Sequence, residues 1–364
     1  MPELLGEITI WAGVVFVLCA TAPRGGWGDE ASELPSGVSP NGPMSTYRRA
    51  EHDGEAARSG GEGPEGKAGP AVPASLALAA LLTGAAGIAF APIFVKISEV
   101  GPVATAFWRV LLALPILLAW MEIEGRRSGK PGRPSSLLEL LALFASGLFL
   151  GSTFALWHLS LGLTSVANST LLVNLAPVFV ALGAWLFLGQ RFGATFLVGM
   201  AMALGGAALL VATGSSRLGG GEMAGDGLAA LAAVFYAGYF LSVSGLRPRF
   251  STAAVMAYGA PAACAALLPV ALLSGEKLLP ASWEGWAVLV AVTLVSQVLG
   301  QSLVAYALVG LPATFSSVAL LLQPTIAAAL AWAILGEALG PWQAAGGAVV
   351  LAGVVLARSG SRRG

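Results

Sequence analysis

Charged residues are scarce in this sequence. Asp, Glu, Lys and Arg make up 10% of the 364 residues, whereas soluble domains carry about 25%. With 56% hydrophobic residues and a mean hydropathy of +0.80, the chain has too little polar surface to cover a water-soluble fold. The 19 basic and 19 acidic residues balance and form no basic cluster, so we expect no nucleic-acid partner.

The sequence also lacks the motifs that mark enzymes and metal sites. Its two cysteines, Cys19 and Cys264, have no CxxC or other ligand spacing, so neither a disulfide framework nor a metal site is indicated. No HExxH segment occurs, and Asp226 alone among the aspartates adjoins a predicted helix. A P-loop (GxxxxGK followed by Ser or Thr) is absent. We therefore expect no catalytic residues, no metal and no cofactor.

Long apolar runs fill most of the chain. Between Ala74 and Ala357 they are long enough to cross a hydrocarbon core of roughly 30 Å, which takes about 20 helical residues. Lipid-exposed backbone must satisfy its own hydrogen bonds, and the alternating pattern of barrel strands is absent, so these spans are predicted helices. The predicted helices are 74–98, 102–121, 137–159, 168–188, 194–213, 227–246, 251–273, 285–308, 313–335 and 341–357. The expected fold is an all-α membrane protein of ten transmembrane helices in a lipid bilayer.

One span is repeated near the C-terminus. The segment LAPVFVALGAWLFLGQ (175–190) is matched 147 residues later by LQPTIAAALAWAILGE (322–337), with Pro177 opposite Pro324. This period is too long for a solenoid repeat of about 20–50 residues, so we interpret it as a duplicated half. Because five helices are an odd number, the halves are predicted to cross the membrane in opposite directions, as two inverted five-helix repeats.

Basic residues are distributed unequally between the loops. If the N-terminus is cytoplasmic, the outer segments contain only Arg217 and Lys277. The cytoplasmic segments then contain Arg126, Arg127, Lys130, Arg133, Arg191, Arg247, Arg249, Arg358, Arg362 and Arg363. The positive-inside rule therefore predicts a multi-pass protein of the plasma (inner) membrane with both termini cytoplasmic.

The N-terminal region differs from the rest of the chain. Residues 22–72 are rich in Gly, Pro, Ser and charge, as disordered segments are. The short apolar stretch before them follows two acidic residues, unlike a signal peptide. Two interpretations stay open: a genuine terminal region, or an upstream extension with Met44 as the true start. The predicted divisions are this extension (1–73), a first repeat (74–213), an outer linker (214–226), a second repeat (227–357) and a cytoplasmic tail (358–364).

A ten-helix chain with this duplicated segment resembles the EamA-type transporters of the drug/metabolite transporter superfamily. The segments GIAFAPIFVK (87–96) and FWRVLLA (107–113) add to the resemblance, which covers about residues 74–357. Gln190 departs from the acidic end of the repeated segment, which Glu337 retains. The resemblance implies a secondary transporter that moves small organic metabolites such as amino acids, commonly outward, by alternating access. Inverted repeats are independently typical of transporters with a site between the halves.

Several polar and aromatic side chains are candidates for a substrate cavity. Arg109 lies about 10 Å into the second span, where a buried charge marks either a function or a structural cap. His158 is either a ligand or proton carrier, or a hydrogen-bonded core residue. The other candidates, which also fit interhelical hydrogen bonds or an aromatic belt, are Trp108, Trp157, Asn168, Asn174, Tyr239, Gln297, Gln301, Tyr306 and Gln323.

Proline and glycine positions give further expectations about packing. Pro177 and Pro324 are predicted to bend their helices at equivalent depths. Close helix approach is expected at Gly199, Gly205, Gly206, Gly346 and Gly347.

The sequence leaves alternatives open for function and for coupling. An intramembrane enzyme and a non-transporting scaffold or channel are the rival classes. No carboxylate is predicted at mid-depth in a span, and His158 is the one membrane group with an ordinary pKa near neutrality, about 6.5. Transport would therefore be either facilitated diffusion or coupled to a proton on His158.

Overall fold

Helices make up the secondary structure of the described part of this chain. The computed structural model describes residues 73–128, 133–164, 166–212, 223–335 and 340–361, which belong to one compact unit. Ten helical stretches in these ranges are long and apolar enough to cross a membrane. The prediction of an all-α membrane fold with ten spans is confirmed. The segment 1–72 with Met44, and most of the 214–226 linker, lie outside the described residues.

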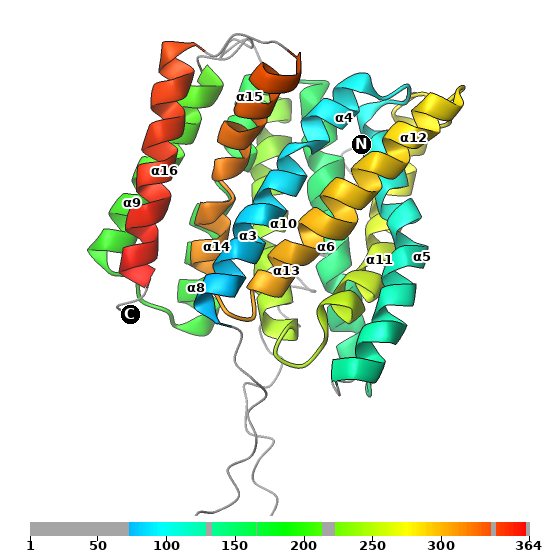
Figure 1. The fold of residues 1–364 in the computed structure, drawn as a ribbon, viewed down its shortest axis with the longest axis horizontal. Helices are drawn as coiled ribbons and strands as arrows, with labels where there is room; N and C mark the ends of the chain where they lie inside the picture. The colour runs from blue at the N-terminus through cyan, green and yellow to red at the C-terminus, as the bar shows by residue number, and fades with distance from the viewer. Residues whose placement is uncertain (1–72, 129–132, 165, 213–222, 336–339, 362–364) are drawn as a thin grey trace, which may run out of the picture. The chain divides into compact units, whose positions relative to one another are not determined.

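Figure 1 shows the helices in chain order. The first repeat contains α3 (Ala74–Ala89), α4 (Ala91–Ile97), α5 (Pro102–Ser128), α6 (Leu137–Leu161), α7 (Val166–Val173), α8 (Ala176–Leu188) and α9 (Ala194–Ala212). The second contains α10 (Met223–Leu246), α11 (Thr252–Leu273), α12 (Trp283–Val292), the π-helix η2 (Thr293–Gln301), α13 (Ser302–Ala307), α14 (Ala313–Ala319), α15 (Leu322–Leu335) and α16 (Pro341–Ser361).

Four spans that were expected to be unbroken are interrupted. The α3–α4 break at Phe90 precedes Pro92, and the α7–α8 and α14–α15 breaks directly precede Pro177 and Pro324. Proline has no backbone N–H and its ring collides with the carbonyl four residues earlier, so the helix cannot continue regularly through it. The eighth span is interrupted differently, by the nine-residue π-helix η2.

Two spans continue four or more residues beyond their predicted C-terminal ends. The helix α5 continues to Ser128 instead of ending at 121, and α16 continues to Ser361 instead of 357. The extra turns contain Glu and Arg, which are good helix formers. Charge therefore marks the end of the apolar region of these spans and not the end of the helix.

The packing follows the duplication. The helices α9 and α16 begin at Ala194 and Pro341, 147 residues apart, and pack against each other. The helix α5 likewise packs against its own counterpart, α11. In addition, α6 packs against α10 and α11, and the counterpart of α6 (α12, η2 and α13) packs against the counterparts of those helices, α3 and α5. Such reciprocal contacts are what two inverted repeats require.

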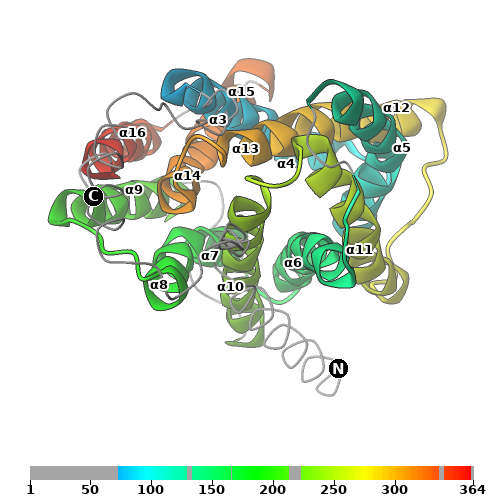
Figure 2. The ribbon, with the colours of Figure 1, turned by 90° about the horizontal axis from the view of Figure 1, so that it is seen from below.

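Glycines allow close contact between α9 and α16. The helices α9 and α16 lie side by side at one edge of the bundle (Figures 1 and 2). A Cβ atom on Gly206 would lie 2.7 Å from the carbonyl oxygen of Gly346, and one on Gly353 would lie 2.8 Å from the carbonyl oxygen of Gly199. The two contacts are equivalent in the repeats, because Gly206 corresponds to Gly353 and Gly199 to Gly346 at the offset of 147 residues. Gly205 was also expected at a close contact, but it faces open space, because it lies about 100° from Gly206 around the helix.

Candidate functional site

Arg109 is a buried cation without a hydrogen-bond or ion-pair partner among the described residues. It lies on α5 and is 6% exposed, with its guanidinium carbon 4.0 Å from the centre of the Phe154 ring on α6. Its Nε atom has no partner. The cation–π contact with Phe154 compensates only part of the hydration that the guanidinium loses on burial.

Two tyrosines of α10 lie on the side of the helix that faces this cation. Tyr236 and Tyr239 stack with ring centres 6.1 Å apart, and Phe240 packs edge-on against Tyr236 at 5.1 Å. The spacing of three and four residues places these rings on one helix face. The phenol of Tyr236 lies in the electrostatic field of Arg109 and within reach of the side-chain amides of Gln301 and Gln323.

Three amide side chains come from the eighth and ninth spans. Gln297 and Gln301 are 2% and 1% exposed and both belong to η2, while Gln323 lies in the first turn of α15, directly after the break. Each retains an unsatisfied atom: Oε1 of Gln297, Oε1 of Gln301 and Nε2 of Gln323. A π-helical insertion widens the turn and often accompanies functional sites, and no signal in the sequence predicted this one.

His158 is positioned by its own helix. Its Nδ1 atom lies 2.7 Å from the carbonyl oxygen of Phe154, one turn earlier in α6, and its ring packs edge-on against Trp157 at 4.9 Å. The carbonyl accepts, so Nδ1 carries a proton. The indole nitrogen of Trp157 has no partner. Arg109 lies close enough to act electrostatically on His158.

These contacts join Arg109, His158, Tyr236, Gln301 and Gln323, which we name the polar cluster. Its first two members come from the first repeat and the other three from the second. Sequence reasoning selected four of the five for the site and did not select Tyr236. It missed Phe154, although a ring four residues from His158 on the same helix face was a usable signal.

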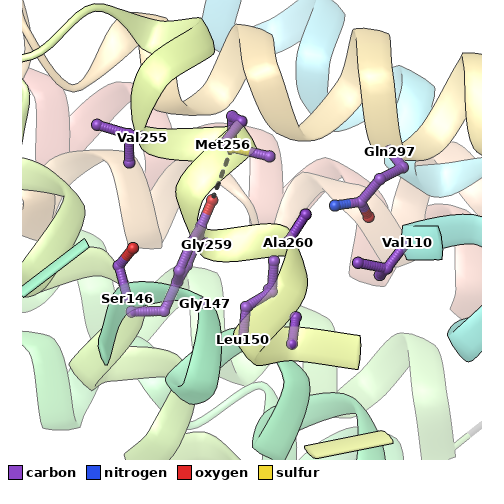
Figure 3. Close-up of a pocket in the computed structure, with 11 residues that line it drawn as sticks. Val110, Ser146, Gly147, Leu150, Val255, Met256, Gly259, Ala260 and Gln297 are labelled. Atoms are coloured by element: carbon purple, nitrogen blue, oxygen red, sulfur yellow. Dashed lines mark hydrogen bonds between the residues drawn. The ribbon is translucent and has the colours of Figure 1, made fainter. Parts of the chain in front are cut away.

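A small cavity lies between the helices that carry the cluster. Its volume is about 10 Å³, enough for roughly one water molecule. Val110 of α5, Leu150 of α6, Met256 of α11 and Gln297 of η2 line it (Figure 3), and Tyr239 completes its wall. The phenol of Tyr239 points to the sulfur of Met256 at 3.9 Å.

Comparisons with known proteins agree with this arrangement of two halves. The model of the EamA-like transporter family matches residues 75–212 and 223–359. The chain belongs to the EamA-like transporter family. This places it among multi-pass membrane transporters.

Two curated relatives and one solved structure are similar to this chain. An uncharacterized transporter of Archaeoglobus fulgidus is 30% identical over 268 residues, 72% of this chain and 91% of the relative. A probable terminal-alkyne amino-acid exporter of Streptantibioticus cattleyicolor is 33% identical over 198 residues, 52% of this chain and 63% of the relative. A crystal structure that is 18% identical superposes with a TM-score of 0.66 over 79% of this chain and 99% of the other, which shows the same fold.

Two glutamates of this EamA-like transporter cap helices at opposite ends of the α5–α11 pair. Glu276, just after α11, accepts the backbone N–H of Ala104 in the first turn of α5 at 3.0 Å. Glu124, near the end of α5, accepts the backbone N–H of Ala253 in the first turn of α11, also at 3.0 Å. A carboxylate at a helix N-terminus satisfies a free donor and the positive end of the helix dipole. Each counterpart helix thus caps the other.

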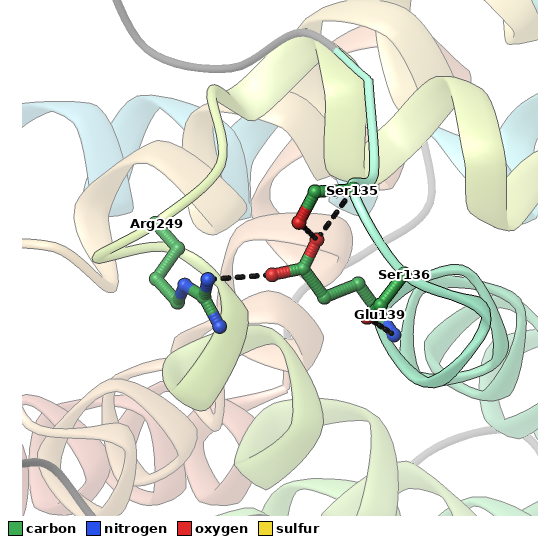
Figure 4. Close-up of polar contacts among 4 residues, drawn as sticks. All are labelled: Ser135, Ser136, Glu139 and Arg249. Carbon is green, nitrogen blue, oxygen red and sulfur yellow. Dashed lines mark hydrogen bonds and ion pairs between the residues drawn. The ribbon is translucent and has the colours of Figure 1, made fainter. Parts of the chain in front are cut away.

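The end of the bundle that holds Glu124 also holds two arginines, and we name it the basic end. Arg247 is 3% exposed and donates from Nε to the carbonyl of Ala305 at 3.0 Å and from Nη1 to the carbonyl of Phe250 at 2.5 Å. The sequence had counted Arg247 only as a loop charge. Arg249 pairs with Glu139 at 2.5 Å (Figure 4).

At the end of the bundle opposite the basic end, Glu99 forms hydrogen bonds with residues 281–282. Its carboxylate accepts from the hydroxyl of Ser282 and from the backbone N–H groups of Ala281 and Ser282. The Ser282 hydroxyl and then these backbone groups hold the pKa of Glu99 below its ordinary value.

The remaining predicted site residues lie in other surroundings. Trp108 donates to the carbonyl of Leu278 at 2.6 Å and packs on Trp286 at 5.1 Å. Tyr306 on α13 lies in the field of Arg247. Asn168 bonds Asp226 at 3.4 Å, and Asn174, at the α7–α8 break, has an unsatisfied Nδ2 atom. No described contact links these four to the polar cluster.

Proposed function

We propose that this chain is a secondary transporter that exports small organic metabolites, such as amino acids, by alternating access between its two repeats. The polar cluster is the substrate site. The observation that carries this proposal is that the cluster is assembled from both repeats and retains unsatisfied polar atoms, on Arg109, Gln301 and Gln323. Buried polar groups normally have partners, and a substrate that binds between the halves would supply them.

The architecture supports a rocking motion. The two caps, Glu124 on Ala253 and Glu276 on Ala104, lie at opposite ends of the α5–α11 pair. Contacts of this kind can open at one end while those at the other end hold, which is what alternating access requires of two inverted halves. Because the chain has no P-loop, a solute gradient supplies the energy.

The charge distribution supports an orientation. The basic end faces the cytoplasm, and both chain termini lie on that side of the plasma (inner) membrane, as the excess of basic residues in its loops favours. The 33% identical relative, named a probable terminal-alkyne amino-acid exporter, supports amino acids as the first substrates to measure.

Counterflow into liposomes tests the proposal. Purified full-length protein is reconstituted, the vesicles are loaded with single unlabelled amino acids, and uptake of the same labelled compound is followed. We expect protein-dependent accumulation for a subset of them. Tyr236→Phe should reduce it roughly tenfold or more, because it leaves two buried amides short of a partner at about 1–3 kcal/mol each. Tyr258→Phe, the same change on α11, is the matched control and should transport normally. The absence of counterflow across a broad panel of metabolites would refute transport.

A further inference from the structure

The described surroundings of Arg109 supply no counter-ion. The nearest charged or titratable neighbours that act on it are His158 and Tyr236, neither of which is an acid that ionises at neutral pH. The described carboxylates with polar partners are engaged elsewhere: Glu99 with Ser282, Glu122 with Arg133, Glu124 with Ala253, Glu139 with Arg249, Glu276 with Ala104 and Asp226 with Thr164. The polar cluster therefore has one uncompensated positive charge inside the bundle.

A buried charge without a partner is costly. Arg247, which is also buried, is an example of an arginine with a structural role. The guanidinium of Arg247 donates hydrogen bonds to the backbone carbonyls of Ala305 and Phe250. Arg109, at 6% exposure, has no such bonds and rests on the face of Phe154 with Nε unsatisfied. Its donors are thus free for a group that enters the site.

We propose that Arg109 binds the carboxylate of the transported substrate, and that the site therefore selects small carboxylates with an apolar or aromatic portion. This proposal rests on the proposed function and adds that the substrate must carry a negatively charged carboxylate. A guanidinium presents a fork of donors that matches the two oxygens of a carboxylate. The binding of one monoanion neutralises the cluster, and Phe154, Trp157 and Tyr236 place aromatic rings next to it for the apolar portion.

The polar cluster binds an amino group less strongly than a carboxylate. Its available acceptor is the neutral Oε1 atom of Gln301, with that of Gln297 nearby beside Tyr239, and no acid is present among the described neighbours. An ammonium group can be hydrogen-bonded there but not ion-paired. Zwitterionic amino acids are therefore accepted, and removal of the amine costs less binding than removal of the carboxylate.

Ligand-dependent thermal stabilisation of the purified full chain in detergent tests this directly. The probes are phenylalanine and leucine, their methyl esters, their decarboxylated amines, and 3-phenylpropionate. We expect the free acids to stabilise the wild type and the esters and amines to bind about 10- to 100-fold more weakly, as for loss of hydrogen bonds to a charged group. The comparison of probes on the wild type needs no variant.

Variants then assign the preference to Arg109. Arg109→Gln should remove the preference for acids over esters, and Arg109→Lys should retain part of it. Arg247→Gln is the matched control, since it removes a buried arginine outside the cluster and should lower stability but leave the preference intact. Failure of all the acids to bind, equal binding of acids and amines, or an unchanged preference in Arg109→Gln would each overturn the proposal.

Flux in liposomes separates this proposal from the proposed function. If the acids bind through Arg109 but none crosses the membrane, the carboxylate site stands and transport fails. If an ester or amine is transported and Arg109→Gln leaves its flux unchanged, transport stands and the carboxylate role fails.

Discussion

Substituting Gly206 by alanine puts one methyl group into a close backbone contact between the two repeats. The new Cβ would lie 2.7 Å from the carbonyl oxygen of Gly346 and 2.7 Å from the backbone nitrogen of Val350, both on α16. These are backbone atoms, so they cannot move aside as a flexible side chain can. The helices α9 and α16 must separate to admit the methyl group.

The neighbouring residue gives the matched control. A Cβ on Gly205 meets no atom within 4 Å. Both substitutions remove a glycine from the interior of the same helix, which by itself stabilises by roughly 0.5–1 kcal/mol. That gain cancels in the comparison, and the remaining difference is the cost of overpacking, about 1–3 kcal/mol. Gly206→Ala should therefore be less stable than Gly205→Ala by this amount.

Unfolding of the two purified variants in mixed micelles measures the difference. Gly205→Ala is expected at or above wild-type stability and Gly206→Ala below it. Gly353→Ala, at the contact that corresponds under the 147-residue offset, should resemble Gly206→Ala, because its Cβ would lie 2.5 Å from the backbone nitrogen of Ala203. Equal stability of the two α9 variants would refute the reasoning from close backbone contact.

Three further predictions concern charge and orientation. The pKa of Glu99 is lowered in the fold, so its stabilising contribution is present above its unfolded value of about pH 4.3 and is lost as the pH falls below it. Melting curves of Glu99→Gln should therefore lie below those of the wild type at pH 7 and merge with them in acid; a constant difference would contradict this. A pH gradient should not drive uptake into liposomes, because His158 is buried and its Nδ1 atom is bonded to the carbonyl oxygen of Phe154; gradient-driven accumulation that is lost in His158→Gln would show that the histidine carries the proton. Single cysteines at positions 128 and 215, in a background without other cysteines, should be labelled from opposite sides of the membrane, and labelling of both from one side would sink the inverted orientation.

The architecture of this protein could be predicted from its amino-acid sequence. A membrane-spanning helix is recognised by the length and apolar composition of its segment alone, so the ten spans could be predicted from the sequence. The duplication was visible because Pro177 and Pro324 keep a constant offset, and the odd number of helices in each half then required opposite orientations. Arg109 and His158 stood out because ionisable residues in apolar spans are rare and costly.

Only the tertiary structure decided which side chains meet. Arg109 and Trp108 are adjacent in the sequence, but neighbouring residues on a helix point about 100° apart, so one contacts Phe154 and the other packs on Trp286. Gln301 and Gln323 are joined through Tyr236, a contact among three different spans. The π-helix that holds Gln301 is likewise a local change of helix geometry within an apolar sequence that predicts a regular span. Hydropathy specifies that a helix enters the membrane, whereas its rotation and its neighbours are set by side-chain packing between residues distant in sequence.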